Sequence, residues 1–322
     1  METNDPGTST ANETALSEGP KTGPQSKSIY ETVTNRILTQ LEQGRIPWRK
    51  TWTSGLPKSL TTGREYRGVN ILVLATAEHT SRYWVTYRQA IRVGGHVRKG
   101  EKATPIVYWK WRNAEDIKKL REKTGKESFA PCVPFMSAVF NLDQVEQIKR
   151  PDDDVPQLPH RRLEIAEKVY EVMPDKPRIE HSATHHPAYA PSVDRVLLPH
   201  LSQFESGAGY YATLFHELVH STGHSKRLNR FRDAQGDLIE QYSFEELVAE
   251  FGAAFLCGFA GFENRETEAL QAAYIQGWMT ALKKDARLIV RAASAAQRAA
   301  DYIRGKLPIE PNADAEPGQA HD

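Results

Sequence analysis

The segment Tyr210-Tyr-Ala-Thr-Leu-Phe-His-Glu-Leu-Val-His220 decides how the second half of this chain of 322 residues folds. It places the spacing H-E-x-x-H inside a helical apolar pattern bounded by glycines, which predicts a helix over about 208–222. Residues four apart on a helix differ by only about 40° around its axis, so His216 and His220 point to one side and can bind one metal ion. Glu217 lies near the same edge, where a carboxylate acts as general base toward a water rather than as a ligand. The segment therefore predicts most of a hydrolytic metal site.

A third ligand must come from another segment, because catalytic zinc sites use three protein ligands and keep one position open. Phe244-Glu-Glu-Leu-Val-Ala-Glu-Phe251 supplies carboxylates on a second predicted helix, over 243–260. Glu246 and Glu250 share one side of this helix, so we assign Glu246 as ligand and Glu250 as hydrogen-bond partner of a ligand imidazole. The reverse assignment of these two stays open. Glu245, about 100° around the helix, is interpreted as a solvated residue.

His224 follows His220 by four residues and is an alternative third ligand. On a straight helix it lies about 12 Å along the axis from His216, too far to share an ion, unless Gly223 turns the chain. Peptide hydrolysis also needs a donor for the oxyanion. The candidates are Tyr210, Tyr211 and His224. The expected cofactor is one divalent metal ion, Zn²⁺, with Mn²⁺ as the alternative.

The net charge of +1 conceals two halves of opposite sign. Residues 28–150 carry 22 Lys and Arg against 11 Asp and Glu, whereas residues 151–322 carry 18 against 26. The basic part also holds five of the six tryptophans. This combination is typical of proteins that bind single-stranded nucleic acid, because cations neutralise phosphates and aromatic rings stack on unpaired bases. The alternative, that any one ring fills the core, stays open. The candidate DNA-binding residues are Trp48, Arg49, Lys50, Trp52, Arg64, Tyr66, Arg67, Arg82, Tyr83, Trp84, Arg88, Lys99, Lys110 and Trp111.

Cysteine content and hydropathy suggest a cellular location. Only Cys132 and Cys257 are present, without a C-x-x-C spacing, so we expect neither a disulfide framework nor a cysteine zinc site. No segment approaches the roughly 18 apolar residues of a membrane span, and residues 1–28 lack the apolar stretch of a signal peptide. We therefore expect a cytoplasmic protein without a membrane partner.

The chain is predicted to be an α+β protein of two domains. Five segments are expected: a disordered tail at 1–27, an α+β nucleic-acid-binding domain at 28–146, a linker at 147–160, a mostly helical domain with a small sheet at 161–306 that carries the H-E-x-x-H segment, and a flexible C-terminus at 307–322. The linker combines prolines with an acidic run, which resists both helix and sheet. We also predict a loop over 113–130, a strand over 134–142, and a helical pattern over 266–304 broken near Gly277 or Asp285.

The second half resembles the zincin-type metallopeptidase domain of ArdC-type plasmid antirestriction proteins. The similarity rests on residues 210–224, on Arg227-Leu-Asn-Arg230 and on residues 245–256. Residues 188–199 resemble the segment that precedes the H-E-x-x-H helix, which in zincins is an edge strand along which a peptide can lie. The resemblance implies a gluzincin-like site with His216, His220 and Glu246 at the ligand positions and Glu217 at the catalytic position.

The first half resembles the N-terminal domain of the same proteins, which also begins the TraC-type plasmid primases and is associated with single-stranded DNA. The matching motifs are residues 29–38, Gly44-Arg-Ile-Pro-Trp48, residues 63–72 and residues 139–144. Together the two resemblances imply an antirestriction protein of a mobile element that binds single-stranded DNA and hydrolyses peptide bonds, acting on an unidentified protein such as a restriction-system subunit.

Two other functions are open alternatives. One is a non-proteolytic factor that protects DNA by binding DNA or protein, with a structural metal site. The other is a metal-dependent nuclease, which is disfavoured because nuclease sites gather carboxylates around hard cations rather than two helical histidines.

Overall fold

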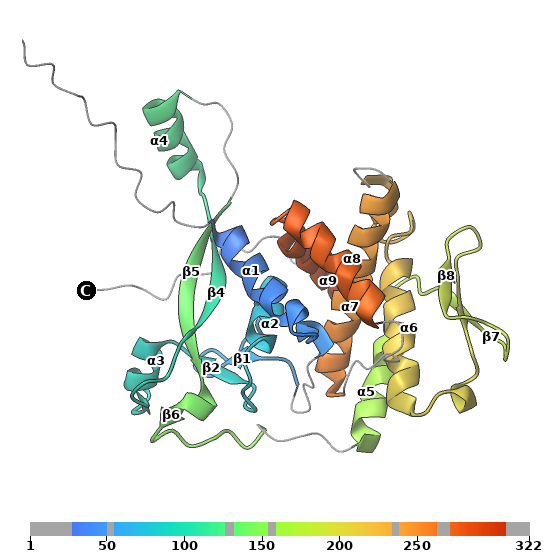
Figure 1. Cartoon of the computed structure of the whole chain (residues 1–322), viewed down its shortest axis with the longest axis horizontal. Helices are drawn as coiled ribbons and strands as arrows, with labels where there is room; N and C mark the ends of the chain where they lie inside the picture. Colours follow the sequence, from blue (N-terminus) through green and yellow to red (C-terminus); the bar gives the residue numbers. More distant parts are fainter. Residues whose placement is uncertain are drawn as a thin grey trace, which may run out of the picture.

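The computed structural model describes residues 28–49, 55–125, 132–153, 159–233, 238–262 and 271–306. The predicted tail, the predicted C-terminus, part of the linker, and Lys50 and Trp52 lie outside the described residues. The chain has two domains of mixed helix and strand content, as the sequence predicts (Figure 1). Among the described residues, no helix is long and apolar enough to cross a membrane.

The N-terminal domain is built around a four-stranded sheet of order β1-β2-β5-β4. Its strands are β1 (Lys58–Ser59), β2 (Tyr83–Val85), β4 (Thr104–Trp111) and β5 (Cys132–Asn141), and a second small sheet pairs β3 (His96–Val97) with β6 (Val145–Glu146). Its helical elements are α1 (Ile29–Glu42), η1 (Pro47–Arg49), α2 (Val69–Ala75), α3 (Tyr87–Arg92), α4 (Ala114–Thr124) and η2 (Leu142–Gln144). Strand β5 covers nearly all of the strand predicted over 134–142.

Helix α4 contradicts the loop predicted over 113–130. Asn113 caps its first turn by accepting a hydrogen bond from the backbone N–H of Asp116 at 2.8 Å, and Gly125 ends it at φ 66°. No residue of α4 is buried, and Ile117 and Leu120 are its only large apolar residues, which is too short a pattern to predict a helix. In Figure 1, α4 stands at the end of the β4–β5 hairpin, away from the helices of the second domain.

The C-terminal domain is mostly helical with a small sheet, as predicted. Its three strands, β7 (Arg178–His181), β9 (Arg195–Leu198) and β8 (Ala188–Ala190), follow the order β7-β9-β8, with β8 antiparallel to β9. The helical elements are α5 (Pro159–Glu171), η3 (Leu201–Gln203), α6 (Gly207–Ser221), η4 (Arg230–Asp233), α7 (Leu238–Ala260), α8 (Gln271–Lys284) and α9 (Leu288–Ile303). The pattern predicted over 266–304 is broken between α8 and α9, at the predicted Asp285 rather than at Gly277.

Helices α6 and α7 pack closely enough to require a glycine at their contact. A Cβ atom on Gly252 of α7 would lie 2.6 Å from a methyl group of Val219 on α6. Such a separation is well inside normal carbon contact, so any larger residue would push the helices apart. This contact lies beside the two segments that carry the predicted metal ligands.

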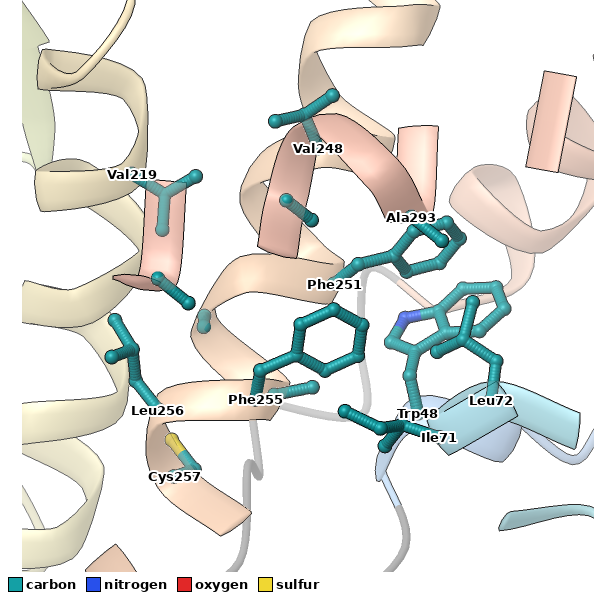
Figure 2. Close-up of a cluster of buried hydrophobic side chains, with 14 of the residues drawn as sticks. Trp48, Ile71, Leu72, Val219, Val248, Phe251, Phe255, Leu256, Cys257 and Ala293 are labelled. Atoms are coloured by element: carbon teal, nitrogen blue, oxygen red, sulfur yellow. The ribbon is translucent and has the colours of Figure 1, made fainter. Parts of the chain in front are cut away.

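The two domains share one hydrophobic core. Trp48 of the N-terminal domain is 1% exposed, and its ring centroid lies 4.9 Å from that of Phe251 (Figure 2). It lies 5.1 Å from that of Trp278. Its indole Nε1 donates a hydrogen bond of 3.1 Å to Oε2 of Glu250 on α7. A second polar contact joins the domains where the Thr34 hydroxyl donates to the carbonyl oxygen of Ala286 at 2.8 Å. The linker therefore joins domains that already share an interior.

Candidate metal centre

Three side chains predicted as metal ligands converge between α6 and α7. The Nε2 atoms of His216 and His220 lie 3.1 Å apart. The Glu246 carboxylate oxygens lie 3.7 Å from Nε2 of His216 and 3.5 Å from Nε2 of His220. Among the described residues, this is the one group of His, Cys, Asp and Glu whose possible ligand atoms gather in this way, all within 4.8 Å of one another.

The spacing of these atoms fits a single metal ion. Ligand atoms held about 2.0–2.1 Å from a tetrahedral zinc ion lie roughly 3.3 Å from one another. The three separations bracket that value, and two imidazoles with one carboxylate is a donor set of catalytic zinc sites. His224, the alternative third ligand, is not in this group. It lies in the turn after α6, where its Nδ1 accepts a hydrogen bond from the backbone N–H of Lys226.

Glu217 is buried beside the two imidazoles and is 7% exposed. Burial raises the pKa of its carboxyl and the charge of Glu246 adds to this, while His216, His220 and a backbone hydrogen bond from Tyr189 oppose it. A carboxyl whose pKa is raised toward neutrality is suited to accept and release a proton. Tyr189 lies on β8, so the edge strand of the sheet passes next to Glu217.

Glu245 is not the solvated residue that the sequence predicts. Its Oε1 lies 3.3 Å from Nδ1 of His220, and Arg230 donates to both carboxylate oxygens, at 2.8 and 2.5 Å. Burial acts to raise the pKa of Glu245, but Arg230 and His220 outweigh it and lower that pKa, so the group stays ionised. Glu245 thus orients a candidate ligand imidazole, which is the role predicted for Glu250. A helical wheel does not reveal this contact, because it depends on Arg230 of η4, which lies 15 positions earlier in the chain.

Glu250 is buried, at 5% exposed, and accepts the hydrogen bond from Trp48 described above. That contact links it to the N-terminal domain, which the sequence does not predict. Its predicted hydrogen bond to a ligand imidazole stays a prediction.

A buried arginine ties the edge strand β8 to the end of α6. The Arg227 side chain is 0% exposed and donates to the Ser221 carbonyl at 2.7 Å, to the Tyr189 hydroxyl at 2.9 Å and to Asp194. The Tyr189 hydroxyl in turn donates to Asp194 at 2.8 Å. These bonds tie the end of α6 to β8 and to the turn that follows it. The sequence gives no role to these residues, because a network of this kind has no local spacing.

The three candidate oxyanion donors lie in different surroundings. Tyr210 is buried, and its hydroxyl lies 2.9 Å from Nε2 of His181. Tyr211 lies about 140° around α6 from His216, and its pKa is raised by burial and by carboxylates of α5, so it faces α5. The roles predicted for Tyr210 and His224 stay predictions. The donor role predicted for Tyr211 also stays a prediction.

Comparison with known proteins identifies the family of this chain. Residues 167–295 match the family described as zincin-like metallopeptidase, and residues 27–140 match the N-terminal domain of anti-restriction factor ArdC. The crystal structure of the metal-free antirestriction ArdC protein from the R388 plasmid superposes with a TM-score of 0.68 at 37% identity, covering 86% of this chain and 97% of that one. The chain belongs to the ArdC family of antirestriction proteins. The Mn(II)-bound structure of the same ArdC protein gives a TM-score of 0.67 at 35% identity, with the same coverage.

The curated relatives include one protein that the chain covers almost completely and two that it covers only in part. The uncharacterized protein y4eC of Sinorhizobium fredii is 34% identical over 300 residues, which is 88% of this chain and 94% of that protein. A DNA primase TraC of Escherichia coli is 35% identical over 306 residues, and a second is 33% identical over 297 residues. Each alignment covers 86% of this chain but only 27% and 20% of the primases, so the chain spans a minor part of those proteins.

The candidate DNA-binding residues of this ArdC-family chain separate into buried and exposed sets. Trp48, Tyr83 and Trp84 are 1%, 4% and 1% exposed, so the prediction that they contact DNA is wrong. These rings are part of the interior, and all three residues of β2 are buried. Other members of the predicted set are engaged within the protein: Tyr66 is half-buried against the core, Arg49 and Arg82 are half-buried, and Arg67 pairs with Asp301 of α9. The exposed members are Arg64, Arg67, Arg88, Lys99, Lys110 and Trp111.

Proposed function

We propose that this ArdC-family protein hydrolyses peptide bonds at the His216, His220 and Glu246 site and binds single-stranded DNA through its N-terminal domain. The convergence of these three donors beside the buried Glu217 carries the proposal. The match to a zincin-like metallopeptidase family supports the reaction class. The expected biological use is protection of incoming DNA, with a protein such as a restriction-system subunit as substrate, in the cytoplasm.

His216, His220 and Glu246 would hold one divalent ion, for which we propose Zn²⁺, with Mn²⁺ as the alternative. Such an ion, when bound, lowers the pKa of a water and polarises the peptide carbonyl. Glu217 takes up the proton of the attacking water and passes it to the leaving nitrogen, which its buried position beside the imidazoles allows. The exposed edge of β8 would align the peptide by backbone hydrogen bonds, because edge strands present unpaired N–H and C=O groups.

Glu217→Gln tests the peptidase function. The variant keeps the size of the side chain and all three ligands, so elemental analysis should give the same metal content as the wild type. Hydrolysis of an unstructured protein such as casein, and protection of transferred DNA, should both fall at least about a hundredfold. Glu205→Gln, an exposed carboxylate at the start of the α6 region, is the matched control.

Retained protection by the metal-loaded Glu217→Gln protein would show that the metal site is structural and that binding alone protects. Metal-dependent cutting of single-stranded DNA that this variant loses would instead identify a nuclease. For the N-terminal domain, affinity should be higher for single strands than for duplex of equal length and should fall steeply with salt. Equal affinity for both forms would contradict the stacking argument.

A further inference from the structure

The β4–β5 hairpin exposes large apolar side chains that the proposed peptidase site does not use. Tyr108, Trp111, Phe135 and Met136 are 37%, 45%, 48% and 38% exposed. The hairpin carries α4 at its far end, and we call β4, α4 and β5 together the arm (Figure 1). Exposed apolar residues gathered on one element mark a contact surface more often than singly scattered ones do.

The strand register sorts these side chains onto two faces. Tyr108 pairs with Phe135, and directly opposed residues of an antiparallel pair project on the same face, with Cβ atoms about 4.5–5.5 Å apart. Lys110 pairs with Val133 and lies on this face too, because side chains two residues apart on a strand share a face. The opposite face begins with Val107, which is buried at 2%, and continues to Trp111. Two exposed rings and an ammonium group therefore share one face.

The charge of the arm indicates which partner this face fits. Residues 104–125 carry six Lys and Arg against three Asp and Glu, and residues 132–141 carry no charged residue. Lys110 is exposed beside the ring pair. A cationic surface with exposed rings matches a polyanion whose bases are unpaired, since the bases of a duplex are already stacked and enclosed.

We propose that Tyr108 and Phe135 form a stacking platform for unpaired bases of single-stranded DNA, with Lys110 binding the adjacent phosphate. This inference rests on the proposed single-strand binding and assigns it a location. It revises the assignment of Trp111, which lies on the other face, and it brings in Tyr108 and Phe135, which are absent from the candidate residues chosen from sequence.

The first test measures binding of a fluorescent oligo-dT of about 20 nucleotides by anisotropy, using the full-length protein. Tyr108→Ala combined with Phe135→Ala should weaken binding at least about tenfold, because the variant loses both rings on which bases would stack. Trp111→Ala should weaken it less than about threefold. Lys110→Gln should weaken binding at low salt and reduce the slope of log affinity against log salt by about 1. Leu201→Ala, an equally exposed apolar residue in the other domain, is the control and should change nothing.

A second measurement does not depend on the variants folding. Oligo-dT carrying 5-iodouracil is photocrosslinked to the wild-type protein, and the modified residue is located by mass spectrometry. Crosslinks should fall on Tyr108 or Phe135. Crosslinks on Tyr87 of α3, which is 55% exposed, or unchanged binding by the folded double variant, would overturn the platform while leaving single-strand binding intact. A wild-type protein that does not bind oligo-dT would instead refute the proposed single-strand binding itself.

Discussion

Replacing Glu245 by glutamine tests whether the partner of His220 controls metal binding. In the structure this carboxylate lies 3.3 Å from Nδ1 of His220 and accepts two hydrogen bonds from Arg230, at 2.8 and 2.5 Å. Its side chain is 17% exposed and that of Arg230 is 11% exposed, so both charges are shielded from water. The amide removes the negative charge that makes the His220 imidazole more basic and so a stronger metal ligand. It also leaves the buried Arg230 guanidinium without its counter-ion.

The expected loss of metal affinity is about 10–100-fold, the usual range for a partner of a metal-binding histidine, or roughly 1.4–2.7 kcal/mol. The assay is a competition titration of Zn²⁺ against a chelator at fixed pH, with Co²⁺ absorption spectra to detect a change of ligand geometry. Glu180→Gln is the matched control: it also removes a carboxylate bonded to an arginine, Arg195 at 2.7 Å, but that pair is exposed and should not affect the metal. Metal affinity within about threefold of wild type for Glu245→Gln would refute the reasoning.

Three further predictions concern the stability of the fold, each measured by urea unfolding followed by circular dichroism. Trp48→Phe keeps most of the ring packing but removes the N–H that donates to a buried carboxylate of α7, so the free energy of unfolding should fall by about 1–3 kcal/mol; no change would mean that the bond is unimportant. Gly252→Ala should lower it by about 1–3 kcal/mol, since the new methyl group meets a valine of α6 at 2.6 Å, and an equally stable variant would show that the helices shift freely. Burial acts to raise the pKa of Asp143, but hydrogen bonds from an arginine and from nearby backbone and hydroxyl groups outweigh it and lower it to about 2. Because the folded pKa is then below the unfolded value of about 3.9, its stabilisation is complete above that pH and is lost as the pH falls toward 2. Asp143→Asn should therefore be less stable than wild type at pH 7, with a difference that narrows at pH 3; a constant difference would contradict the assignment.

The sequence predicts which candidate ligands lie together, because their convergence follows from local geometry. Spacing along one helix places His216 and His220 together, and a second helical pattern supplies Glu246. The choice between Glu245 and Glu250 as partner of an imidazole depends on Arg230 of η4. The spacing of residues along α7 does not show where η4 lies.

Aromatic composition is a weaker guide to the N-terminal domain. The tryptophans of this domain differ in burial: Trp48 and Trp84 fill the interior, whereas Trp111 is exposed. Alternation along β4 separates Tyr108 from Trp111, but the partner of Tyr108 depends on the register with β5, a strand more than 20 residues later. Helix α4 is missed because Ile117 and Leu120 are its only large apolar residues, which is too short a pattern to predict a helix.

Trp48 also bears on how such chains are inherited and recombined. Its side chain packs into the interior of the other domain. If the gene were divided at the linker, one domain would expose Trp48 and the other would have a cavity in its place. Exchange between mobile elements should therefore preserve both domains as a single cassette. The alignments with the much longer TraC primases cover 86% of this chain and so include both domains, as expected if the two domains are inherited together.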